Sequence, residues 1–416
     1  MTFFIRSFIF IAILAAIDTY VWQAFKTLQA AKWVGWLYWV VTALVYIGIL
    51  AAALTDARTW PTIFRTYLFS AIVILLVSKL IVVVFLLLDD ISRFMQFLWH
   101  KINPTAAIPD SATEISGKSN TITRSKFLSL LGLGLGSIPL LTLMWGIIRN
   151  AHNYQIKRVL LPIANLPAAL QGLTIAQISD IHSGSFVDAK PVQKGINLLN
   201  SLNPDLVFFT GDLVNMTANE IEPYLSIFGQ IQSKYGVFSI TGNHDYADYM
   251  PFTREERAQN FEQLKKMQQR MGWQLLLNEH KIIQIEDENL AVIGVENWSN
   301  KARFSKYGDL AKAYSGCEDA AIKLLLSHDP SHWRAQVLPQ FPDIQATFSG
   351  HTHGFQFGVD KPWLKWSPAK WMYSEWLGLY NEGKQYLYVN PGFGYLGYPG
   401  RVGILPEITL FELTTA

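Results

Sequence analysis

Residues 205–212 read Asp-Leu-Val-Phe-Phe-Thr-Gly-Asp, an apolar run that ends in a glycine and a carboxylate. A short run of branched and aromatic residues with turn-forming residues behind it is typical of a buried β-strand. Polar residues directly after such a strand lie at the carboxyl edge of a sheet, where α/β folds bind their ligands. We therefore expect Asp212 to belong to a functional site at this edge.

Four further apolar runs, on both sides of this one, also end in polar residues. Mixed segments between the runs, such as 192–202 and 255–271, suit helices that cover a sheet. The pattern predicts an α/β (α+β layered) domain over about residues 155–416, with the ends of its strands meeting in one crevice. The four endings are Ser179-Asp180-Ile181-His182, Thr241-Gly242-Asn243-His244-Asp245, Ser327-His328-Asp329 and Ser349-Gly350-His351-Thr352-His353.

The side chains at these strand ends are carboxylates, imidazoles and an amide, which divalent metal ions bind. Two metal ions ~3.5–4 Å apart need a bridging carboxylate, and together they activate a water molecule for attack on phosphorus. Gly211, Gly242 and Gly350 precede predicted ligands, where a sharp turn or a close approach of backbone to ligand needs a glycine. The sequence therefore predicts a two-metal centre.

The five motifs, in this order, resemble those of the calcineurin-like metallophosphoesterases over about residues 160–413. The segment from Tyr388 to Ile408 is similar to the membrane-associated bacterial branch of that family. The resemblance implies a four-layer αββα sandwich and two divalent metal ions (Mn, Fe, Zn or Co, with Mn favoured). Phe355 stands where that branch commonly has a glycine. Because it falls outside the ligands, we expect it to affect substrate fit rather than metal binding.

The resemblance also implies roles for single residues. His244 contacts the phosphoryl group or protonates the leaving oxygen, Asn243 stabilises charge on the phosphoryl oxygens, and Asp245 orients His244. Asp329 is either a turn residue or part of the site, and His332, outside the motifs, is expected to be structural. The implied metal ligands are Asp180, His182 and His353 for one ion, Asn243, His328 and His351 for the other, and Asp212 as the bridge.

Residues 1–150 differ in character and are predicted to form a membrane domain. Two of their apolar segments carry no charge, and at ~1.5 Å of rise per residue each can cross a hydrocarbon core of ~30 Å. A third segment contains Lys79, and the first contains Arg6 and Asp18. We predict four transmembrane helices, over about residues 2–25, 33–55, 66–88 and 127–148.

Asp18 and Lys79 lie inside predicted spans, where an unpaired charge costs at least a few kcal/mol. We favour a structural pairing of the two, or snorkelling, over a polar functional site in the bundle. Residues 89–126 are predicted to form a polar loop. Within it, residues 91–102 are expected to form a short interfacial helix and residues 103–123 an exposed stretch.

Composition excludes several classes of function. The chain has 34 basic and 32 acidic residues, which gives no electrostatic case for binding nucleic acid. The single cysteine, Cys317, excludes an intramolecular disulfide and a cysteine metal cluster. The distribution of Lys and Arg between the two sides leans towards an extracytoplasmic catalytic domain, and residues 123–128 resemble a degraded twin-arginine export signal. The oligomeric state is left open.

These observations predict a membrane-anchored phosphoesterase that hydrolyses a phosphate ester or pyrophosphate of a lipid-linked substrate. Four tryptophans lie between Trp363 and Trp376, with Lys365 and Lys370 among them. This pattern favours contact of the segment with the bilayer or a lipid tail over a small core of its own. Relatives in the resembling branch cleave UDP-2,3-diacylglucosamine, which makes it the first candidate. The alternatives are a broad-specificity membrane-tethered phosphatase or phosphodiesterase, and a non-catalytic scaffold that has kept the fold.

Overall fold

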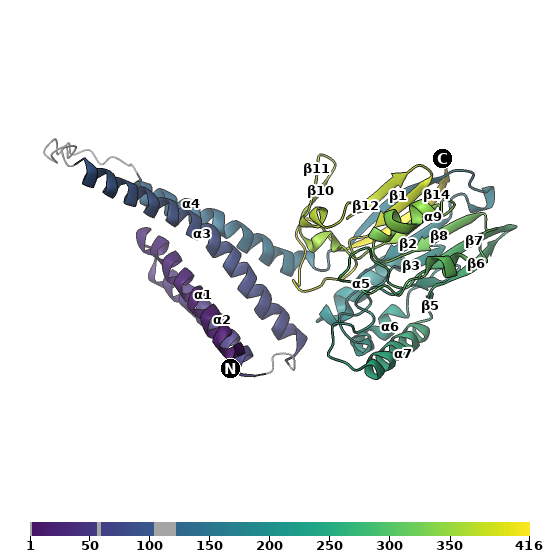
Figure 1. Ribbon diagram of the computed structural model, residues 1–416, viewed down its shortest axis with the longest axis horizontal. Coiled ribbons are helices and arrows are strands. Elements are labelled where there is room, and N and C mark those ends of the chain that lie inside the picture. The colour runs from purple at the N-terminus through teal and green to yellow at the C-terminus, as the bar shows by residue number, and fades with distance from the viewer. Residues whose placement is uncertain (1, 56–59, 104–121) are drawn as a thin grey trace. The chain divides into compact units, whose positions relative to one another are not determined.

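The computed structural model describes residues 2–55, 60–103 and 122–416 (Figure 1). Contacts divide the chain into two compact units, Met1–Met144 and Trp145–Ala416. Most of the exposed stretch predicted over residues 103–123 falls outside the described residues.

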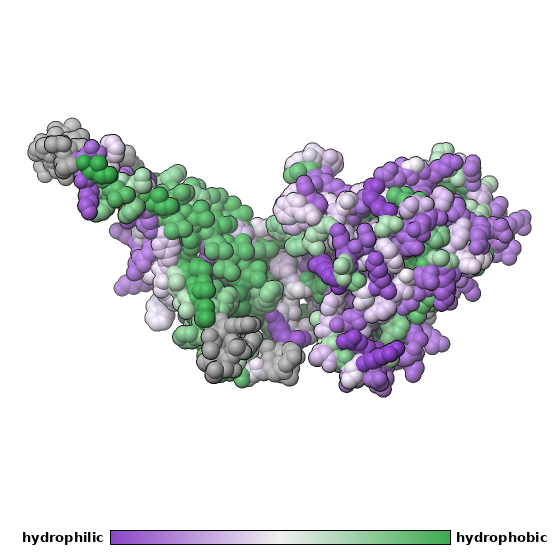
Figure 2. Space-filling model, viewed as in Figure 1, coloured by the Kyte–Doolittle hydropathy of each residue, from purple (hydrophilic) through white to green (hydrophobic). Residues whose placement is uncertain are grey.

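The first unit is helical, and its outer surface is strongly hydrophobic (Figure 2). Four helices are long and apolar enough to cross a membrane, as predicted. The last of them continues into a π-helical turn, η3, at Gly146–Asn150. The helices are α1 (Thr2–Thr27), α2 (Lys32–Leu54), α3 (Thr62–Ile102) and α4 (Arg124–Trp145).

Residues 91–102 are helical as expected, but as the continuation of α3. The predicted polar loop over residues 89–126 was therefore wrong at both ends, since α3 ends at Ile102 and α4 begins at Arg124. Residues 62–102 contain no glycine or proline, and thus nothing in them stops the helix. The carboxylate of Asp89, in the middle of α3, is buried and accepts a hydrogen bond from Arg93 Nε at 2.9 Å. Arg124 of α4 lies 3.4 Å from the same carboxylate. These ion pairs let the helix continue past its acidic residues.

Asp18 of α1 and Lys79 of α3 form an ion pair, which confirms the predicted pairing. The Asp18 carboxylate also accepts hydrogen bonds from the hydroxyls of Tyr38, at 2.8 Å, and Tyr46, both on α2. One buried carboxylate thus joins three helices, and each of its partners offsets part of the cost of burying the charge.

The second unit contains two six-stranded sheets and a two-stranded hairpin. Strands β2 to β5 are mutually parallel, as are β7, β8, β9 and β13. In order across the first sheet, the strands are β1 (Gln155–Ile163), β14 (Glu407–Thr415), β2 (Thr174–Ile178), β3 (Leu206–Phe209), β4 (Val237–Ser239) and β5 (Gln274–Leu275). In the second sheet they are β12 (Gly378–Glu382), β13 (Gln385–Val389), β9 (Ala346–Ser349), β8 (Ile322–Leu326), β7 (Glu288–Gly294) and β6 (Glu279–Ile285).

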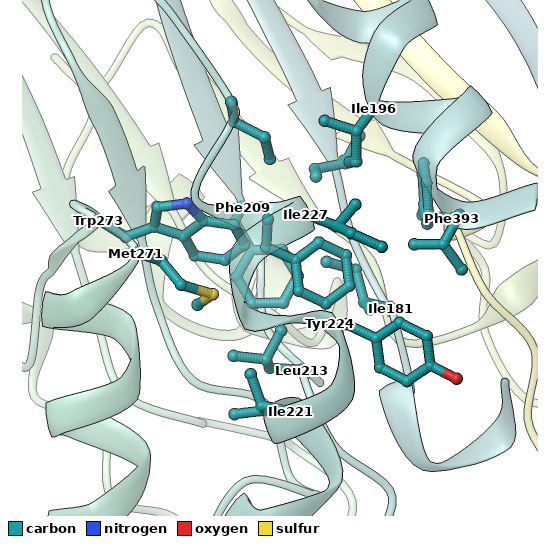
Figure 3. Packing of buried hydrophobic residues seen from close by; sticks show 14 of the residues in the cluster. Ile181, Ile196, Phe209, Leu213, Ile221, Tyr224, Ile227, Met271, Trp273 and Phe393 are labelled. Atoms are coloured by element: carbon teal, nitrogen blue, oxygen red, sulfur yellow. The ribbon is translucent and has the colours of Figure 1, made fainter. Parts of the chain in front are cut away.

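Strand β3 shows why the two sheets pack face to face. Its Leu206 and Phe208 belong to a hydrophobic core that also takes in Leu324 and Phe348 of the second sheet. Val207 and Phe209 point the other way, into a core shared with the helices on the outer face of the first sheet (Figure 3). Both faces of the strand are buried, which accounts for its unbroken apolar run.

Helices complete the outer layers. On the first sheet lie α5 (Ala189–Asn200), α6 (Leu225–Phe228) and α7 (Arg254–Arg270), and against the second lie α8 (Leu310–Tyr314) and α9 (Leu338–Gln340). The caps explain where the two long helices begin: Asp188 accepts from Lys190 N at 2.9 Å, and Thr253 forms a capping box with Glu256. The four-layer αββα sandwich is therefore confirmed.

The alternation in β3 generates a stability prediction. Phe208→Ala removes a fully buried ring from between the sheets and should lower the free energy of unfolding by about 3–5 kcal/mol. Leu160→Ala in β1 is the control, because that side chain is 62% exposed and its loss should change stability by no more than about 0.5 kcal/mol. Chemical denaturation of the detergent-solubilised chain checks both, and equal losses would contradict the layer assignment.

Candidate metal centre

Polar side chains that follow four of the five strands singled out, β2, β3, β4 and β9, line one cleft of about 460 Å³. His328, after β8, lies behind this lining, with Nε2 3.2 Å from Asp212 Oδ2. The predicted ligands are gathered in and directly beneath this cleft, and six of the seven are buried, His351 being half-buried. Two groups of three side chains can each hold a metal ion, with their ligand atoms within 4.8 Å of one another. The groups are Asp180, His182 and His353, and Asp212, His328 and His351.

In the first group, three ligand atoms converge. His353 Nε2 lies 3.0 Å from His182 Nε2 and 3.2 Å from Asp180 Oδ1. Bonds from imidazole nitrogen to a divalent ion are about 2.0–2.1 Å long, so two ligands adjacent on one ion are separated by about 3 Å. The spacing and chemistry of this group therefore fit a bound metal ion.

In the second group, His328 Nε2 lies 3.2 Å from Asp212 Oδ2 and 3.2 Å from His351 Nδ1. Asp212 Oδ2 is also 3.6 Å from His182 Nε2 of the first group, so this oxygen lies between the two sets. Asn243, on the loop after β4, lines the same cleft. Its Nδ2 donates to Tyr249 Oη at 2.8 Å, while its buried Oδ1 has no partner among the described residues. An unpaired buried oxygen is costly unless something binds it, and a metal ion would.

Neighbouring groups determine which ring nitrogen faces the centre. His328 Nδ1 donates to Thr210 O at 2.7 Å, which leaves Nε2 for the metal. On the far side of His351, Tyr373 Oη donates to Asp329 Oδ2 at 3.2 Å and lies 2.8 Å from His351 Nε2. His351 Nδ1 lies 3.2 Å from His328 Nε2, so Nδ1 is the ring nitrogen on the side of the centre. Asp329, left open by the sequence, is thus part of the site's support.

The backbone that carries these ligands is strained. Asp180, His182, Asp212, His351 and His353 all have φ between 48° and 72°, a left-handed conformation that non-glycine residues rarely adopt. Such residues cost on the order of 1–3 kcal/mol each, and they persist where the surrounding structure requires them. Here that conformation turns each ligand sharply out of its strand into the cleft.

Glycines make room for these turns, as predicted. A Cβ at position 242 would lie 2.2 Å from Asp212 Oδ1, and one at 350 would lie 2.2 Å from Asp180 Oδ2. Gly211 has φ +93°, which a side chain would resist. Two of the glycines therefore let the ligand carboxylates approach the neighbouring backbone.

Electrostatics favour the ionised form of the Asp212 carboxylate. Burial would raise the pKa of Asp212, but the nearby His328 and His244 outweigh it and hold that pKa well below its usual range. Burial also opposes the charged form of His328, yet Asp212 raises the pKa of this imidazole to about 10. Each group favours the charged form of the other. Metal binding at His328 would therefore have to displace a proton.

His244 lies at the rim of the centre, and its ring stands 4.9 Å from that of His182. Its Nδ1 donates to Asn215 O at 2.7 Å, so Nε2 is the nitrogen available to a ligand in the cleft. Asp245 does not orient this ring, and that expectation was wrong. Its carboxylate accepts instead from the backbone N–H groups of Gly242, Asp212 and Leu213, because it sits beneath the two loops and ties them together.

Several residues around the centre were not predicted. Tyr249 orients Asn243, Tyr373 orients His351, and buried Arg401 places Nη2 3.4 Å from His353 Nδ1 while donating to the carbonyl of Pro391. None of them follows an apolar run directly, so the strand-end pattern contained no signal for them. Phe355, the residue in place of a glycine, keeps a left-handed φ of 58° and lines the cleft.

The tryptophan segment begins inside the hairpin of β10 (Val359–Lys361) and β11 (Leu364–Trp366), since Trp363 lies in its turn and Trp366 ends β11. Trp376 is buried in a small core with Tyr373 and Ile404, whereas Trp363 and Trp371 are 79% and 72% exposed. The small core of its own is therefore present around Trp376, and contact with the bilayer or a lipid tail stays a prediction for which Trp363 and Trp371 are exposed.

Residues 173–355 match the family model of the calcineurin-like phosphoesterases, and residues 1–151 match the model described as the transmembrane domain of a probable calcineurin-like phosphoesterase. The chain therefore belongs to the calcineurin-like metallophosphoesterases and is an integral membrane protein of that family. Members of this family use divalent metal ions, which the site's donor set fits.

Among its relatives, a "Transmembrane protein with metallophosphoesterase domain" from Danio rerio is 32% identical over 66% of this chain and 60% of its own length. A Bos taurus protein of the same name is 28% identical over 65% and 60%. The "UDP-2,3-diacylglucosamine pyrophosphatase LpxG" of Chlamydia trachomatis is 28% identical over 62% of this chain and 88% of its own length. The chain thus spans 60% of the length of the two vertebrate relatives.

Proposed function

We propose that this protein is a membrane-anchored phosphoesterase that hydrolyses a phosphate ester or pyrophosphate with two divalent metal ions, Mn favoured. The position of Asp212 Oδ2 carries the proposal, because it lies 3.2 Å from His328 Nε2 and 3.6 Å from His182 Nε2, between the two ligand groups. A non-catalytic scaffold is the weaker candidate. A chain released from catalysis would be expected to lose ligands, and this chain keeps every predicted one.

In this proposal, Asp180, His182 and His353 hold one ion, Asn243, His328 and His351 hold the other, and Asp212 contacts both. Metal ions in such a pair activate water and neutralise charge on the phosphoryl oxygens. The chain supplies the remaining functions. Asn243 Nδ2 is held by Tyr249, which leaves Oδ1 for an ion. His244 is fixed through Nδ1, so that Nε2 of the doubly protonated ring can donate a proton to the leaving oxygen.

Asp212→Asn tests the two-metal assignment. The change keeps the size of the side chain but removes the charge that both ions share. Turnover should fall by about 10³-fold or more, since activation of water and charge stabilisation would fail together, while the thermal melting profile shows a folded protein. Full activity in a metal-replete Asp212→Asn sample would refute the assignment.

His244→Ala tests the proton donor. Its ring is tied to the chain through Asn215 O, outside both ligand groups, so the variant should keep both ions. Turnover should fall by about 10²–10⁴-fold, the usual contribution of a general acid. Elemental analysis of the purified variant provides the check, because the loss of one ion would make His244 a ligand.

We further propose that the substrate is linked to a lipid. The membrane helices tether the catalytic unit to the bilayer, which gives no advantage with a freely diffusing substrate. The cleft has an apolar side formed by Phe355, Met372 and Leu396. The relative LpxG is named for a lipid substrate, and UDP-2,3-diacylglucosamine is accordingly the first compound to test. A broad-specificity phosphatase that is merely tethered to the membrane is the alternative.

Two equally exposed tryptophans distinguish these alternatives. Trp371 lies beside the cleft, in a cavity that shares Met372 and Tyr373 with it, whereas Trp363 lines neither cavity. Trp371→Ala should lower kcat/KM for UDP-2,3-diacylglucosamine, or a phospholipid-type substrate, by roughly 5–10-fold through lost apolar contact, and leave the water-soluble headgroup analogue unchanged. Trp363→Ala is the matched control. Equal efficiency on both substrates in all three proteins would exclude lipid recognition at this wall.

The distribution of basic residues supports an extracytoplasmic catalytic domain. Protease treatment of intact cells or spheroplasts tests this orientation. Cleavage within residues 155–416 without lysis is the expected result, and a fully protected catalytic domain would reverse the topology. An outward orientation would favour phospholipid-type or undecaprenyl-type headgroups over a nucleotide-linked precursor that is made in the cytoplasm.

A further inference from the structure

A second cavity, of about 440 Å³, adjoins the metal cleft. Arg303, Met372 and Tyr373 line both, so the two share a wall. Tyr373 links that wall to the metal centre, because its hydroxyl lies 2.8 Å from His351 Nε2. A molecule whose phosphoryl group is at the metal centre can therefore extend into the second cavity.

The second cavity is positively charged. Lys301 and Arg303 line it, and no carboxylate does among the residues that the structure describes. Neither cation forms an ion pair with a carboxylate in the described parts of the chain. Two cations that face a cavity without a counter-charge favour an anion there.

The cations are held in relation to the metal centre by aromatic rings. The guanidinium of Arg303 lies 4.4 Å from the centroid of the Phe304 ring, and that ring packs edge-on against His351 at 4.8 Å. Lys301 Nζ stands 5.3 Å from the centroid of the Tyr373 ring. Cation–π contacts of this kind orient a charge without neutralising it.

Besides Asn300, the remaining lining is formed by Ala302, Trp371, Met372 and Tyr373 and is largely apolar. Trp371 is 72% exposed and packs edge-on against Trp366, with ring centroids 5.9 Å apart, and Met372 is 39% exposed beside it. The cavity thus pairs a cationic side with an apolar side. That combination fits an anionic group attached to an apolar one.

We infer that the second cavity is a subsite for a second, non-reacting phosphate of the substrate, bound by Arg303 and Lys301, with the apolar substituent of that phosphate against Trp371. The substrate class is a diphosphate ester of an apolar alcohol, an inference that rests on the proposed function. Phosphate suits the site because the planar guanidinium of arginine binds it through two parallel hydrogen bonds.

The reaction balances with water alone. Water attacks the terminal phosphorus at the metal centre, and the bond from that phosphorus to the bridging oxygen breaks. The bridging oxygen keeps the electron pair and takes up a proton, which His244 is placed to donate. Inorganic phosphate leaves the metal centre, and the monophosphate ester leaves the second cavity.

A matched pair of substrates tests the subsite. Farnesyl diphosphate and farnesyl monophosphate share their apolar part and differ by one phosphate. For Arg303→Ala in the metal-loaded full-length protein, kcat/KM should fall by about tenfold or more on the diphosphate, mainly through KM, and by less than about threefold on the monophosphate. Arg303→Lys should lie between Arg303→Ala and wild type. An equal loss on both substrates would overturn the subsite.

Lys306→Ala is the control variant. Lys306 lies on the same segment, 4.4 Å from the Trp298 ring centroid, and lines neither cavity, so both substrates should be unaffected. A loss on the diphosphate as large as that of Arg303→Ala would mean that general charge, not the subsite, attracts the substrate.

A binding measurement separates this inference from the proposed function. Calorimetry with non-hydrolysable methylenediphosphonate, and with methylphosphonate for comparison, needs no turnover. Arg303→Ala should weaken binding of the diphosphonate about tenfold and leave the monophosphonate unchanged. If no ester is hydrolysed, the proposed function fails while this difference still supports the subsite. If esters are hydrolysed and the difference is absent, the subsite fails alone.

Discussion

The carboxylate of Asp212 is the group on which the rest of the catalytic unit depends. It lies at the end of β3, buried, with Oδ2 directed at His328 and His182 and Oδ1 accepting the backbone N–H of His244 at 2.9 Å. A charge buried this deeply is stable only with partners on all sides. The surrounding loops provide those partners. Asp245 in turn ties the backbone of Asp212 to the β4 loop, so a single network positions ligands from three strands.

Bringing so many polar groups together strains the backbone, and packing between the two sheets offsets that strain. The ligand residues adopt left-handed backbone conformations that would relax in a looser fold. The core between the sheets, with fully buried rings such as Phe208 and Phe348, keeps the strands from moving and so maintains the strained turns at their ends. Stability is concentrated in the strands, and the chemistry is placed where they end.

In the membrane unit, too, a buried carboxylate depends on its partners. Asp18 is tolerated among apolar helices because Lys79, Tyr38 and Tyr46 satisfy it. The sequence revealed that pairing because two opposite charges stood alone in otherwise apolar segments. The length of α3 was missed although residues 62–102 contain no glycine or proline and Asp89 pairs with Arg93 one turn further on, and only the pairing with Arg124 of α4 needed the tertiary structure. A polar stretch in sequence resembles a loop until its partners are known.

By itself, the sequence determined the five strands that carry the motifs, the order of those motifs, the set of side chains at their ends and the presence of four apolar helices. These features are local, because an apolar run and the ligand behind it are consecutive in the sequence. The run is unbroken because both faces of the strand are buried. Only the tertiary structure decided that Asp245 holds the two loops together rather than orienting His244. It also decided that Tyr373 and Asp329 orient His351, and that Lys301, Arg303 and Trp371 line one second cavity. Those pairings join residues distant in the chain, and their energies depend on contact rather than on sequence position.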